Sequence, residues 1–167
     1  MNDLKDIIWA LLQPVNGVRL PRLIKEIYLV DWKCAFEYPP RPCTFKWIYG
    51  PCGPTSEKIE ECVRQNSDMF RIEEVQTQSG VGMFTVYRQN MEYVPKLTDG
   101  VASAIDLVIR VAAQKSWEEL TLLISSTYPI MQSSMLDTID IERYAKEYRE
   151  ILGRRRVIQD ELPTNLG

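Results

Sequence analysis

The sequence contains no histidine. Histidine is the most frequent general base, the usual partner of a catalytic nucleophile and the commonest metal ligand, so all three roles lose their main candidate. An enzyme would then need a pair of carboxylates, or a cysteine activated by lysine or arginine, and no constellation in the sequence specifies either. We therefore expect a protein that is not an enzyme and that carries no cofactor.

The sequence also lacks closely paired cysteines. Its four cysteines are spread almost evenly, with no C-x-x-C pair: Cys34, Cys43, Cys52 and Cys62. A structural zinc site normally takes its ligands in close pairs from tight turns, so we predict no metal site and reduced thiols. The segment from Gly50 to Pro54 has no Gly-Lys-Ser/Thr ending, and its prolines lack N–H groups, which argues against a phosphate-binding loop.

Long apolar runs and a strong charge excess are absent as well. No stretch is long and apolar enough to span a bilayer, and acidic residues stand at the N-terminus where a signal peptide is basic. We therefore expect a cytoplasmic protein with no membrane partner. The net charge of −3 and the pI of about 5.2 give no global reason to bind nucleic acid. With 167 residues, the chain suffices for one domain with a sizeable core.

The most informative stretch runs from Leu20 to Pro54. Pro21 suits the first turn of a helix, where its missing N–H has no partner to lose. Apolar residues then recur at helical spacing, at Leu20, Leu23, Ile24, Ile27 and Tyr28. The other side of this helix is predicted to be polar and to carry Arg22, Lys25 and Glu26.

Asp31 falls on the apolar side of the same helix. An unpaired buried carboxylate is costly, so Asp31 must be hydrogen-bonded or lie at the rim of the core. One interpretation is a rim carboxylate paired with a lysine or a backbone N–H, and the other is a partner-binding or catalytic acid. Nothing nearby supplies a second catalytic group, which favours the structural interpretation.

A strand and a turn follow the helix. Thr44 to Tyr49 alternates and is rich in residues that favour strands, and two Gly-Pro pairs break it. Thr55 or Ser56 then caps a helix that runs to Gln65. Trp47 and Tyr49 point the same way on the predicted strand, so we expect them to pack on the preceding helix.

A β-hairpin comes next, with strands at Phe70 to Ile72 and Met83 to Arg88. Together with Thr44 to Tyr49 it is predicted to form a three-stranded sheet. The order helix, helix, strand, helix, hairpin is that of a winged helix. The recognition helix would be Thr55 to Gln65, where acidic residues outnumber basic ones, so DNA binding is possible but disfavoured.

The C-terminal half is predicted to be helical, with a capping box at Ser116 and Glu119. A last helix begins near Ile141 and ends at Gly153. Arg154, Arg155 and Arg156 then form either a solvated end that complements the helix dipole or a contact for an acidic partner. We therefore expect one domain over 1–153 and a flexible basic tail over 154–167. The predicted fold is α+β: mainly α with a small antiparallel β-sheet, a helical bundle plus a β-hairpin.

Two short motifs carry a family resemblance. They comprise Leu23, Ile24, Tyr28, Leu29, Asp31 and Trp32 in the helix, and Trp47, Tyr49, Gly50 and Pro51 in the strand and turn. In these motifs the chain resembles the Panacea domain family, which contains the SocA-like antitoxins. The resemblance implies a mainly helical cytoplasmic protein with a small sheet that binds and does not catalyse. Panacea proteins neutralise co-encoded toxins, often by direct contact, and others occur in mobile elements such as prophages and in antiviral (phage-defence) systems.

Two functions are therefore open. The first is an antitoxin-like module of a toxin–antitoxin, phage-defence or anti-defence system that acts by protein–protein contact. The alternative is a winged-helix-like DNA-binding transcriptional regulator, for which the 55–65 helix and the hairpin should be basic. A homo-oligomer is also open. We expect the partner-binding residues to be Tyr38, Tyr49, Tyr87, Tyr93, Arg154 and Arg155. Each of these tyrosines could equally fill the core.

Overall fold

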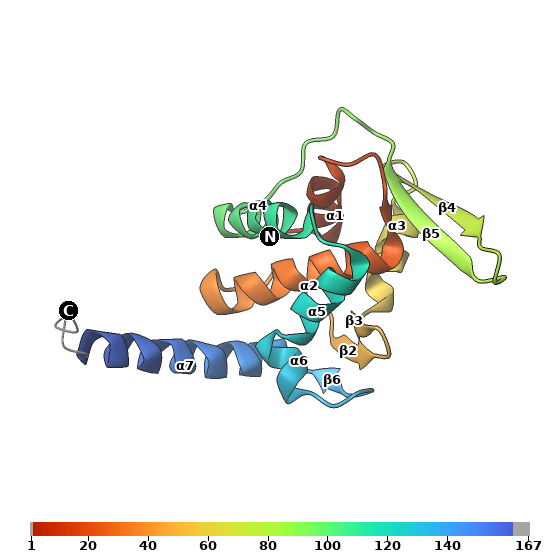
Figure 1. Cartoon of the computed structure of the whole chain (residues 1–167). Coiled ribbons are helices and arrows are strands. Elements are labelled where there is room, and N and C mark those ends of the chain that lie inside the picture. The colour runs from red at the N-terminus through yellow and green to blue at the C-terminus, as the bar shows by residue number, and fades with distance from the viewer. Residues whose placement is uncertain (1, 162–167) are drawn as a thin grey trace.

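The computed structural model describes residues 2–161, and the side chains of residues 2–156. It is mainly helical with small antiparallel sheets, which confirms the predicted α+β class (Figure 1). Within the described residues the order of elements is α1 Leu4–Leu12, β1 Val18–Arg19, α2 Leu20–Glu37, β2 Trp47–Gly50, β3 Gly53–Thr55, α3 Glu57–Gln65, β4 Phe70–Gln76, β5 Gly82–Arg88, α4 Asp99–Ala112, α5 Trp117–Ser125, α6 Tyr128–Gln132, β6 Thr138–Ile139 and α7 Ile141–Glu161.

The first sheet has the strand order β1-β5-β4. The hairpin strands pair from Phe70 opposite Arg88, and Val18 of β1 lies opposite Val86. We predicted Thr44 to Tyr49 as the third strand of this sheet. That prediction is wrong, because the third strand is β1, which pairs with β5. With β1 directly before α2 and paired to the second hairpin strand, the N-terminal half has the element order of a winged helix, as predicted.

The second sheet has the order β3-β2-β6. Its central strand begins at Trp47 and includes Gly50, so the predicted strand starts too early. Gly53 has a φ of 103°, a left-handed conformation that glycine adopts without strain, and this lets β3 fold back on β2. Trp47 also pairs with Ile139 of β6, which joins the two halves of the chain.

Helix α2 lies at the centre of the molecule (Figure 1). It contacts the helices α1, α4, α5 and α7 and the strands β1, β3 and β5. The predicted polar side is therefore wrong for Lys25, whose residue surface is only 2% exposed. Arg22 and Glu26 are half-buried and form an ion pair at 3.3 Å.

Helix starts follow local capping chemistry. The capping box predicted before α5 is confirmed, because the Glu119 N–H donates to Ser116 Oγ at 3.1 Å and the Ser116 N–H donates to Glu119 Oε2 at 2.9 Å. Of the two candidates before α3, Ser56 is the cap, and its hydroxyl accepts from the Lys58 N–H. No helix among residues 2–161 is long and apolar enough to cross a bilayer.

Helix α7 extends to Glu161, so the predicted end at Gly153 is wrong. A helix-ending glycine normally takes a positive φ, and Gly153 is not among the residues that do. Arg154, Arg155 and Arg156 consequently lie within the helix, exposed, and do not cap its end. Figure 1 shows this helix projecting from the body at the end opposite the hairpin. Residues 162–167 of the predicted tail lie outside the described residues.

Candidate functional site

Asp31 is fully buried, and its carboxylate accepts hydrogen bonds from three residues. Arg41 donates to it through Nη2 at 2.7 Å and Nε at 3.1 Å. The Cys43 N–H donates at 3.0 Å, and the Trp47 indole N–H donates at 2.8 Å. The prediction that Asp31 is hydrogen-bonded is confirmed, including its backbone N–H partner, whereas the rim position is wrong and the cationic partner is an arginine, not a lysine. The carboxylate therefore joins the connection after α2 to the start of β2.

The other residues of the structural motif lie around the same junction. Tyr28 packs edge-on against Trp47 with ring centroids 5.6 Å apart, and its hydroxyl is hydrogen-bonded to the Thr127 hydroxyl at 2.9 Å. Trp32 packs against Tyr148 of α7 at 5.4 Å. Leu23 is fully buried. Gly50 ends β2, and Pro51 begins the turn that leads into β3. These side chains join α2 to β2 and to the C-terminal helices.

A pocket of about 480 Å³ lies over α2. Four segments surround it: the start of α2, the turn between β2 and β3, the tip of the hairpin and the first residue of α5. Its walls are almost entirely apolar and include Pro21, Ile24, Pro54, Met83, Phe84 and Trp117. Pockets of this size and composition are typical of ligand-binding sites.

Among the residues that the structure describes, Lys25 is the one charged residue that lines this pocket. Its ammonium donates to the carbonyl of Cys52 and lies 5.0 Å from the ring centre of Trp117. Among the described residues it forms no ion pair. Burial lowers the pKa of Lys25 below that of an ordinary lysine. Sequence reasoning missed this residue because it grouped Lys25 with Arg22 and Glu26 on the polar side of the helix.

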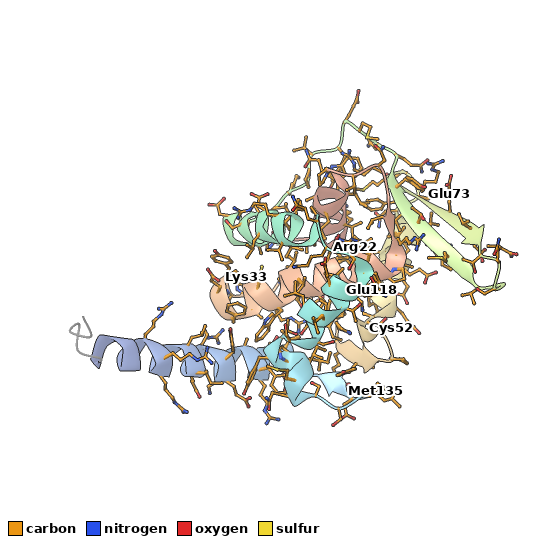
Figure 2. All side chains as sticks on the ribbon, in the orientation of Figure 1. Arg22, Lys33, Cys52, Glu73, Glu118 and Met135 are labelled. Carbon is orange, nitrogen blue, oxygen red and sulfur yellow. The ribbon has the colours of Figure 1, made fainter. Side chains whose placement is uncertain are left out.

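A second feature is a set of exposed apolar side chains from β2, from α6 and from the loop before β6, here called the methionine patch: Ile48, Met131, Met135 and Leu136, which are 45%, 61%, 55% and 74% exposed. Figure 2 shows Met135 beside β6 at the margin of the molecule. Leu136 has a φ of 75°, a conformation that costs about 1–2 kcal/mol for a residue with a Cβ. Hydrogen bonds from Leu136 N–H to Tyr49 O and from Tyr49 N–H to Asp137 O hold this loop against β2.

The four tyrosines predicted as partner anchors are all half-buried and come from separate regions. Tyr38 packs beside Gly100 of α4, and Tyr93 donates to Asp6 and packs on Trp9. Hydrogen bonding to Asp6 raises the pKa of Tyr93 to about 12. Tyr87 lies under the guanidinium of Arg71. Tyr49 alone borders the methionine patch, so the four tyrosines do not form one surface.

Within the described part of the chain, the surfaces that a winged helix would present to DNA carry few basic side chains. On α3, Lys58 pairs with Glu61 and Arg64 pairs with Glu60, both at 2.8 Å. The hairpin between Arg71 and Arg88 contains no lysine or arginine. Arg71 pairs with Glu73, and Arg88 donates to the Gln13 carbonyl beside Trp9. Arg154 and Arg155 are exposed, but they lie on α7 at the other end of the molecule (Figure 1).

The described residues contain no group of three or more histidine, cysteine, aspartate or glutamate side chains placed to hold a metal ion. No family model matches the chain, and no curated protein or solved structure matches it either. The Panacea resemblance therefore stays a prediction that depends on the motif residues alone.

Proposed function

We propose that this chain is a non-catalytic, protein-binding module that acts stoichiometrically in the cytoplasm, in the manner of an antitoxin. The partner would be a co-encoded toxin or a component of a phage-defence or mobile-element system, as the Panacea resemblance implies. The observation that carries the proposal is the methionine patch. Its four side chains are large, apolar and exposed, and flexible methionine side chains adapt well to a protein surface.

The conformation of Leu136 adds to this argument. A leucine at a positive φ is unfavourable, and the hydrogen bonds between its loop and β2 keep it there. The result is a side chain that stands 74% exposed between Met135 and the sheet. Such a side chain offers a partner an apolar anchor on a loop that hydrogen bonds already hold in place.

The charge of the winged-helix elements favours protein over DNA as the partner. Affinity for DNA depends on lysine and arginine side chains that neutralise phosphates. On α3 the two cations are each held by a glutamate, and the tip of the hairpin has none. A transcriptional regulator is therefore the second candidate, and it retains only the order of elements as support.

The test is co-expression with the product of the adjacent reading frame, followed by size-exclusion chromatography. We expect a stable complex of fixed stoichiometry. Replacing Leu136 with asparagine, which tolerates a positive φ, should weaken binding at least tenfold, because the apolar anchor is lost while the loop is retained. The matched control is Val94→Ser, a change at an equally exposed apolar residue outside the patch, which should leave binding unchanged.

Two other outcomes would redirect the assignment. If no complex forms and the protein instead shifts a fragment of its own promoter with a steep salt dependence, the regulator is correct. If the isolated protein is a dimer by analytical ultracentrifugation, and Leu136→Asn converts it to a monomer, the methionine patch binds a second copy of this chain.

A further inference from the structure

The pocket over α2 holds a cation that nothing in the described chain neutralises. Lys25 lines this pocket with an exposed fraction of 2%, and among the described residues its one hydrogen-bond acceptor is the carbonyl of Cys52. An ammonium group has three donors, and a charge removed from water is costly unless an anion pairs with it. A structural lysine would be expected to meet a carboxylate, yet none of the lining residues is acidic.

We propose that this pocket binds an organic monocarboxylate with an apolar body. The carboxylate accepts hydrogen bonds from the Lys25 ammonium, and the hydrocarbon part lies against Phe84, Met83 and Trp117. The volume of about 480 Å³ is sufficient for a small ligand of this kind. No residue of the methionine patch lines the pocket, so the site is separate from the surface proposed for the protein partner.

The lining also restricts the charge and the shape of the anion. Phosphates are usually held by several backbone N–H groups or by more than one cation. Here Pro21, Pro51 and Pro54 contribute no N–H, and Lys25 is the only cation that lines the pocket. One cation in an apolar enclosure matches a single negative charge, and the aromatic rings of Phe84 and Trp117 match an aliphatic or aromatic body.

The electrostatics of Lys25 agree with this ligand. Burial disfavours the ammonium form and lowers the pKa of Lys25, while a carboxylate in contact would favour the ammonium form again. Binding of the anion therefore relieves the cost of keeping this cation away from water. A neutral ligand of the same shape would gain only the apolar contacts.

The experiment compares octanoate with 1-octanol, and phenylacetate with phenylacetamide, by calorimetry and by NMR of the full chain at neutral pH. We expect each carboxylate to bind about tenfold to a hundredfold more tightly than its neutral counterpart, the range for a charge-assisted hydrogen bond. The Lys25 side-chain signals and the Trp117 indole signal should move on titration with the carboxylates. Lys25→Met should remove the preference, and Lys25→Arg should retain part of it.

Lys46→Met is the matched control, because Lys46 is an exposed lysine that does not line the pocket. It should bind both carboxylates as the wild type does. Equal binding of the charged and neutral compounds would overturn the proposal, as would no binding of either carboxylate at millimolar concentration. If Lys25→Met does not fold, the wild-type comparison and the location of the shifted NMR signals decide the outcome. Shifts confined to residues outside the pocket would overturn the proposal.

Discussion

Replacing Asp31 with alanine tests whether this carboxylate holds the centre of the fold together. Its oxygens accept hydrogen bonds from Arg41, from the Cys43 N–H and from the Trp47 indole N–H, all in a site without solvent exposure. In Asp31→Ala these donors lose their acceptor, and the arginine keeps a charge that is only 15% exposed. The change removes few atoms, so the consequence is almost entirely electrostatic.

The expected loss is large compared with the stability of a domain. Removing one partner of a buried ion pair lowers the free energy of unfolding by about 3–5 kcal/mol. The two N–H groups left without partners are part of the same site, so their separate costs do not simply add. For a chain of this length the loss corresponds to a decrease in Tm of about 6–20 °C. Asp31→Ala combined with Arg41→Met should be no less stable than Asp31→Ala alone, because the unpaired guanidinium is then gone.

The assay is urea unfolding followed by tryptophan fluorescence and by far-UV circular dichroism, with Tm measured in parallel. Glu73→Ala is the control, because Glu73 forms an exposed ion pair with Arg71 at 2.7 Å. Its effect should stay within about 1 kcal/mol, as for other surface pairs. The reasoning is refuted if Asp31→Ala unfolds within about 1 kcal/mol of the wild type with an unchanged m-value.

Further predictions concern other buried and exposed groups. Trp47→Ala should cost about 3–5 kcal/mol in a thermal or urea melt, because the side chain is fully buried; normal stability with lost partner binding would make Trp47 an interface residue. Burial raises the pKa of Cys43, whereas Cys52 is exposed, so mass spectrometry should find Cys52 alkylated in the native protein and Cys43 only after unfolding. Leu136→Gly should unfold at no lower urea concentration than the wild type, because glycine adopts a positive φ without strain. Protein purified without added zinc should contain none by elemental analysis; one equivalent, lost together with the fold in cysteine-to-serine variants, would contradict this.

Local chemistry predicted much of the secondary structure. The capping box at Ser116, the hairpin and the first turn at Pro21 each depend on residues a few positions apart, and each is confirmed. The pairing of strands was not predictable in the same way. A strand of two residues, Val18–Arg19, carries no periodic signal, and it takes the sheet edge that was expected for Thr44 to Tyr49.

The errors at Lys25 and Gly153 have related physical causes. A charged residue on a helix is expected to face water, but here distant segments cover the face that carries Lys25. A glycine near the end of an apolar pattern suggests a helix stop, yet glycine within a helix costs only about 1 kcal/mol relative to alanine. Helix α7 continues through it and carries the three arginines outward. Both outcomes depend on the surroundings and not on the neighbouring residues in sequence.

The candidate site was even less accessible from sequence. Exposed leucine and methionine residues look the same in sequence as buried ones, so aromatic residues were the natural choice of anchor. The tyrosines instead packed into separate parts of the surface, and the patch arose from a loop with an unusual leucine conformation. The pocket needed four segments from both halves of the chain, and its lysine was predicted to face solvent.

The position of β2 between β3 and β6 affects how the chain folds during its synthesis. β3 is made within seconds of β2, but the partner of the other edge, Thr138–Ile139, follows about 90 residues later. At about 5–20 residues per second, that edge stays open for about 5–20 s on the ribosome. An open strand edge is a template for pairing with other chains. Until β6 is made, this edge of Trp47–Gly50 stays open to pairing with other chains.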